Sequence, residues 1–60
     1  MKKYKEPSLF DKVKINDERF TNYGLIGRVC GVIDSYNFMV KFENGDVFDY
    51  PTYVLDVKKQ

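Results

Sequence analysis

Few side chains in this 60-residue chain are suited to catalysis or metal binding. There is no His, which removes imidazole as a general base or metal ligand near neutral pH. The single cysteine, Cys30, has only Arg28 as a basic neighbour in the sequence, so no activated thiolate is predicted. One cysteine also forms neither an intrachain disulfide nor a cysteine-based zinc site. We therefore expect no enzyme activity, no metal site, no other cofactor and no small-molecule substrate.

The acids of residues 43–49 are the remaining candidates for acid–base or metal chemistry. Glu43 and Asp46 flank a predicted turn, whereas Asp46 and Asp49 lie three residues apart on a predicted strand and face opposite sides. Their spacing matches no calcium-binding loop. We interpret them as solubilising charges on a hairpin, with a protein-docking surface as the alternative.

The net charge of +1 conceals an uneven distribution. Residues 1–33 contain seven basic and four acidic side chains, whereas residues 34–57 contain one basic and five acidic side chains. Lys and Arg gathered on one face bind phosphates with release of counterions. The candidates for such contacts are Lys12, Lys14, Arg28, Lys58 and Lys59.

Two alternatives to phosphate binding stay open for these cations. The basic side chains form a solvated face that keeps the protein soluble, in line with a pI of 7.8, below the value above 9 that is typical of strong nucleic-acid binders. Arg28 by itself is alternatively an outward strand residue paired with a cross-strand acid such as Glu43.

The aromatic content of 17% divides into predicted core and loop rings. Rings in loops stack on bases or anchor a protein partner. Tyr23 and Tyr36 are the candidates for base stacking, and Phe20 and Tyr53 join them in the protein-docking alternative or else cap the ends of a barrel. The rings assigned to the core are Phe10, Phe38, Phe42, Phe48 and Tyr50.

These side chains must be positioned by strands, because the dominant hydrophobic period from Leu9 onward is two residues. Asn44-Gly45 between two such runs predicts a type I′ hairpin turn. A polar loop covers residues 16–24, a turn 34–37 and a 3₁₀ turn 51–54. Residues 1–8 are expected to be a polar, flexible lead-in and residues 9–60 a single domain. The predicted strands are 12–15, 27–33, 38–43, 46–50 and 55–58.

Five short strands, a long loop after the first and a tight turn before the last resemble an SH3-like barrel. Val13-Lys14-Ile15, followed after a loop by Gly27 and then Val29, is similar to the KOW and Tudor-like branch, in which a glycine precedes a β-branched strand. The chain also resembles small barrel proteins of phages and prophages over residues 10–58. The resemblance implies an all-β fold whose first and last strands lie side by side, so that the basic termini form one patch.

The resulting expectation is a non-enzymatic binding module that contacts nucleic acid or a nucleoprotein complex through its basic face. The alternative is a protein–protein accessory or inhibitor, phage-encoded, that docks through the loop aromatics or the acidic hairpin. No apolar run approaches the roughly 20 residues that span a membrane, and no secretory signal is predicted. A cytoplasmic monomer or weak dimer is therefore expected.

Overall fold

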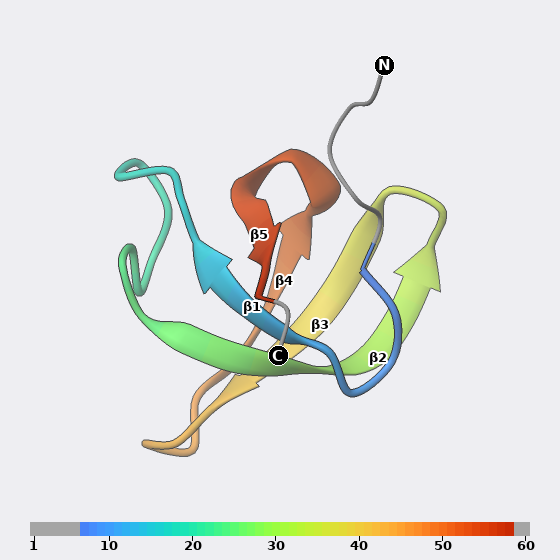
Figure 1. The fold of residues 1–60 in the computed structure, drawn as a ribbon, viewed down its shortest axis with the longest axis horizontal. Helices are drawn as coiled ribbons and strands as arrows, with labels where there is room; N and C mark the ends of the chain where they lie inside the picture. Colours follow the sequence, from blue (N-terminus) through green and yellow to red (C-terminus); the bar gives the residue numbers. More distant parts are fainter. Residues whose placement is uncertain (1–6, 59–60) are drawn as a thin grey trace.

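The computed structural model describes residues 7–58, which form one antiparallel sheet of five strands (Figure 1). The strand order across the sheet is β4-β3-β2-β1-β5. A single 3₁₀ turn, η1, precedes the last strand. The elements are β1 (Lys12–Ile15), β2 (Ile26–Asp34), β3 (Asn37–Phe42), β4 (Val47–Pro51), η1 (Thr52–Val54) and β5 (Leu55–Val57). The all-β prediction is confirmed, and each predicted strand end lies within one residue of the observed one.

The core lies on one face of this curled sheet because alternate residues of β1 and β3 point the same way. Phe20 and Val57 pack against its border. The predicted core rings Phe38, Phe42 and Tyr50 are confirmed. The buried apolar residues are Val13, Ile15, Val29, Phe38, Val40, Phe42, Tyr50, Val54 and Leu55.

Two predicted core rings are exposed. Phe48 is opposite Val40 on the inward face, but it lies on an edge strand and keeps 39% of its surface accessible. Phe10 is 67% exposed because it lies in a turn before β1, outside the alternating pattern of the strands. The assignment of Phe10 to the core is therefore wrong. Phe48 points toward the core as predicted, but it is not buried.

The two edge strands are joined directly by η1. Since β4 and β5 lie at opposite edges of the sheet and only three residues separate them, the sheet curls until these edges approach (Figure 1). Within residues 7–58 no backbone ladder joins β4 to β5, so the sheet is curled but not closed. The predicted side-by-side arrangement of the first and last strands is confirmed by the antiparallel pairing of β1 with β5.

The hairpin between β3 and β4 differs from the predicted type I′ turn. Gly45 has a φ of 96°, but Asn44 is absent from the residues with positive φ, whereas a type I′ turn requires both. The Gly45 N–H donates to the Phe42 carbonyl (3.0 Å), and the Phe42 N–H donates to the Asp46 carbonyl (2.9 Å). This is a three-residue loop that ends on a left-handed glycine. The Asp46 N–H donates to Asn44 Oδ1 (2.9 Å), which stabilises the alternative geometry.

The start of the described chain is tied to β2. Residues 1–6 of the predicted lead-in lie outside the described residues, while Pro7 is buried. The Ser8 N–H donates to Asp11 Oδ2 (2.9 Å), and the Asp11 N–H donates back to the Ser8 carbonyl (3.0 Å). The Phe10 N–H then donates to the Val29 carbonyl (2.7 Å). Together with the Val29 N–H bond to the Asp11 carbonyl (2.9 Å), this bond extends the pairing of β1 with β2 back to residue 10.

Candidate nucleic-acid interface

Four cations lie in one row across the outward face of the sheet. Lys12 of β1 is directly opposite Arg28 of β2, and Arg28 is directly opposite Lys41 of β3. The Lys58 N–H donates to the Lys12 carbonyl (2.9 Å), which extends the β1–β5 ladder and places Lys58 opposite Lys12. Directly opposed residues of an antiparallel pair project from the same face. We call Lys58, Lys12, Arg28 and Lys41 the basic row.

The basic row depends on two irregularities in β2. At the turn Asp34 is opposite Asn37, and an unbroken ladder from there would place Arg28 opposite Glu43. Register shifts between Val32 and Asp34 and between Val29 and Gly31 each insert one extra residue into β2. Together they move Arg28 by two positions along β3, from Glu43 to Lys41. The predicted pairing of Arg28 with Glu43 is therefore wrong.

The row leaves positive charge uncompensated. Within residues 7–58 the ion pairs are Arg19–Asp17 and Lys58–Asp56, so Lys12, Arg28 and Lys41 have no carboxylate partner there. The Lys58–Asp56 contact is long, at 3.9 Å, and exposed. Like charges directly opposite each other on a sheet destabilise it by up to about 1 kcal/mol per pair. An extended polyanion laid across the strands would relieve this repulsion.

Of the other two predicted basic residues, only Lys14 lies within the described part of the chain, and it is outside the row. Lys14 projects from the same face of β1, but it is opposite Ile26 on one side and Asp56 on the other. Its charge therefore has an acidic neighbour, unlike that of Lys12. Lys59 lies outside the described residues. Lys41 was not predicted as a site residue, because only the register of β3 against β2 reveals its position beside Arg28.

The two predicted base-stacking aromatics lie at opposite ends of β2. Tyr36 lies in the β2–β3 turn, at the opposite end of β2 from Arg28, and Tyr23 lies in the loop before β2. Phe20 packs against the core and contacts Tyr50 and Tyr53, with ring centroids 6.2 and 6.4 Å apart. Phe20 is therefore partly buried at the border of the core, while Tyr53 lies against Phe20 and stays exposed. The structure brings neither Tyr23 nor Tyr36 into the row.

The loop between β1 and β2 is held in place by the core and by the β3–β4 hairpin. The buried Tyr50 hydroxyl donates to the Thr21 carbonyl (2.7 Å), and burial is the main cause that raises the pKa of Tyr50, with the charge of Asp46 second. Asn22 Nδ2 donates to Asp46 Oδ2 (3.4 Å). Asp46, one acid of the predicted acidic hairpin, is thus hydrogen-bonded to the β1–β2 loop.

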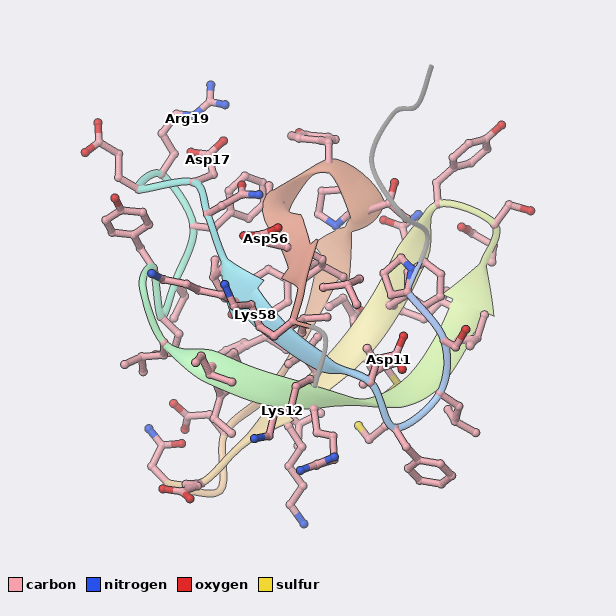
Figure 2. The ribbon with its side chains drawn as sticks, viewed as in Figure 1. Asp11, Lys12, Asp17, Arg19, Asp56 and Lys58 are labelled. Carbon is pink, nitrogen blue, oxygen red and sulfur yellow. The ribbon has the colours of Figure 1, made fainter. Side chains whose placement is uncertain are left out.

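Arg19 belongs to a separate local pair in this loop (Figure 2). Its Nη2 donates to Asp17 Oδ2 (2.6 Å), and its backbone N–H donates to Asp17 Oδ1 (2.9 Å). These bonds, led by the side-chain one, lower the pKa of Asp17 from 3.8 to about 2. Figure 2 shows the pair at the outer end of the loop, away from Lys12 and Lys58.

The Arg19→Gln substitution is expected to raise the pKa of Asp17 from about 2 back toward 3.8, because the largest cause of the shift is removed. The folded pKa lies below the unfolded one, so the stability contributed by Asp17 is present above pH 3.8 and is lost as pH falls toward 2. A carboxyl NMR titration measures both values. Asp34 is the internal control, since its lowered pKa depends first on the Tyr36 N–H. An unchanged Asp17 titration in the variant would contradict the assignment.

An open hollow lies over the outward face of β2, and its lining joins the basic row to apolar side chains. Lys12, Arg28 and Lys41 line it together with Phe10, Ile26 and Cys30. Glu43 also lines the hollow and is its one carboxylate. Cys30 is free and exposed, at the position of one register shift. Phe10 is a second lining residue, besides Lys41, that the sequence reasoning missed, because apolar character alone assigned it to the core.

Comparisons with protein-family models, with curated proteins and with solved structures find no match for this chain. In residues 7–58 there is no helix of the length and hydropathy that crossing a membrane requires. The same residues contain no cluster of three or more Cys, Asp or Glu side chains arranged to hold a metal ion. The interface must therefore be interpreted from its own geometry.

Proposed function

We propose that this protein is a non-enzymatic binding module that contacts nucleic acid through the basic row. The observation that carries the proposal is the register that aligns Lys58, Lys12, Arg28 and Lys41 across four strands. Adjacent strands are about 4.8 Å apart, so the row extends over roughly 14 Å. Several phosphates of one backbone fit along that length.

The charge balance of the face supports a polyanion as the partner. Three of the four cations lack a carboxylate partner within residues 7–58, and their mutual repulsion is a cost to the fold. A phosphate backbone neutralises them and releases condensed counterions. Docking of a protein through loop aromatics has less support, because Tyr23 and Tyr36 lie at opposite ends of β2.

The curled five-stranded sheet, the long loop after β1 and the 3₁₀ turn before β5 support an SH3-like barrel of the KOW or Tudor-like type as the fold identity. We propose that a module of this kind acts in the cytoplasm on nucleic acid or a nucleoprotein complex, without a cofactor. The fold hosts many functions, so the basic row and not the fold carries the functional proposal.

The proposal is tested by NMR titration with short single-stranded and duplex oligonucleotides at low salt. Amide signals of Lys12, Arg28, Lys41 and Lys58 are expected to shift, while those of the Ser35-Tyr36 turn stay in place. Four phosphate contacts predict a slope of log affinity against log salt of about −3. Binding that is insensitive to salt would indicate protein-like docking instead. The absence of any shift at low salt would refute the proposal.

A further inference from the structure

Phe10 occupies a backbone position that is normally reserved for glycine. Its φ is 72°, in the left-handed region that bulky residues avoid. The Asp11 N–H bond to the Ser8 carbonyl makes Phe10 the third residue of a four-residue turn, where positive φ favours Gly or Asn. The Phe10 N–H donates to the Val29 carbonyl, and the Val29 N–H donates to the Asp11 carbonyl (2.9 Å). Residues 10 and 11 thus oppose Val29 as a bulge, whose left-handed first position is also typically Gly.

The strained conformation is held in place while the ring itself is left in solvent. The Phe10 N–H bond to Val29 is short, at 2.7 Å, and Arg28 Nη1 donates to the Phe10 carbonyl (3.1 Å). The side chain nevertheless remains 67% exposed. Core packing therefore does not explain an aromatic residue here. Strained residues that the surrounding structure holds in place are concentrated at binding sites.

The ring lies beside the basic row. Phe10 lines the same hollow as Lys12, Arg28 and Lys41, and its carbonyl accepts a hydrogen bond from Arg28. Aromatic rings next to a cationic track bind single-stranded nucleic acid, because unpaired bases stack on the ring while phosphates follow the charges. In a duplex the base faces are stacked on each other and are not accessible to the ring.

We infer that Phe10 is a stacking platform for a base of single-stranded nucleic acid whose phosphates lie along Lys12, Arg28 and Lys41. This inference rests on the proposed function and names the class of nucleic acid that the same face prefers. It moves the stacking role from Tyr23 and Tyr36, which lie outside the hollow, to Phe10.

The test compares three ligands of equal length: an oligothymidylate, the same backbone with abasic sites, and a duplex. Phe10→Ala is expected to weaken oligothymidylate binding roughly fivefold to a hundredfold, the range for loss of one stacking ring. The abasic strand and the duplex should bind the variant and the parent protein equally. Phe10→Tyr should restore binding, whereas Phe10→Leu, which keeps apolar area without a ring, should not.

Two controls separate stacking from folding. Phe10→Gly suits the positive φ, so its thermal unfolding midpoint should equal or exceed that of the parent while oligothymidylate binding still falls. Tyr36→Ala removes an exposed ring outside the hollow and should leave all three affinities unchanged.

The outcomes distinguish base stacking on Phe10 from the proposed binding of nucleic acid by the basic row. If the parent protein binds the strands but Phe10→Ala binds them equally well, the inference fails and the proposed function stands. An equal loss of affinity for the abasic strand also overturns stacking, since Phe10 would then act through Arg28. If the parent binds no ligand at low salt, both fail together.

Discussion

Replacing Gly27 with Ala is expected to destabilise the protein by about 2–3 kcal/mol, the upper part of the range for overpacking a filled core. A Cβ at this position would lie 2.6 Å from Val40 Cγ1, 2.8 Å from the Lys41 carbonyl oxygen and 3.0 Å from Phe42 Cδ2. Two of these neighbours belong to buried side chains, and the third is backbone of the paired strand β3. The carbonyl cannot move without disturbing the β2–β3 ladder, and the two side chains are confined by the core around them.

The expected loss is large for this chain, because a domain of 60 residues has a total stability of about 3–9 kcal/mol. Chemical denaturation followed by circular dichroism measures the change. Gly31→Ala is a matched control in the same strand, since its new Cβ would meet only the Met39 side chain, with Sδ at 3.1 Å. A flexible thioether can shift, so this variant should lose less than about 1 kcal/mol. Equal denaturation midpoints for the two variants would contradict the packing argument.

Lys41→Glu is expected to stabilise the fold and weaken nucleic-acid binding at the same time. The substitution converts the Arg28–Lys41 cross-strand pair from like to opposite charges, which favours the sheet by up to about 1 kcal/mol. If the row binds phosphates as proposed, the same change removes one contact and adds repulsion. We expect affinity for a short oligonucleotide at low salt to fall about tenfold or more, with a salt slope shallower by about one.

Denaturation and binding isotherms on one protein sample measure both effects. Arg19→Glu is the control for net charge, because it changes the charge by the same amount at a loop pair outside the row. Its affinity should fall far less than that of Lys41→Glu. A Lys41→Glu protein that is less stable than the parent would contradict the cross-strand repulsion. Unchanged binding would show that the row is an ordinary solvated face.

The strands and most of the core could be predicted because they depend on local pattern. Alternating apolar residues in 12–15 and 38–42 can bury one face only as strands, and both were predicted at nearly the observed bounds. Pro51 lacks an N–H to extend a ladder, and it ends β4 on an edge of the sheet. Gly27 lies where β2 and β3 approach too closely for a Cβ, and the sequence marked it as the glycine of the KOW-like pattern.

The candidate interface was only partly predictable, because its two decisive features depend on register and backbone strain. Without the extra residues in β2, Arg28 would face Glu43 and the row would contain an acid. Hydrophobicity assigned Phe10 to the core, but hydrogen bonds to Val29 and Arg28 hold it in a left-handed turn at the surface. No local sequence pattern predicts the register of β2 against β3 or the left-handed turn at Phe10.

The amino-acid sequence by itself thus determined an all-β protein with a tight turn before its last strand and a core of β-branched and aromatic residues. It did so because side-chain alternation and turn chemistry act over a few neighbouring residues. Strand register and long-range hydrogen bonds set which charges lie together and which ring stays in solvent. Those outcomes depend on pairing between residues distant in the chain, where one extra residue in a strand changes every opposed pair beyond it.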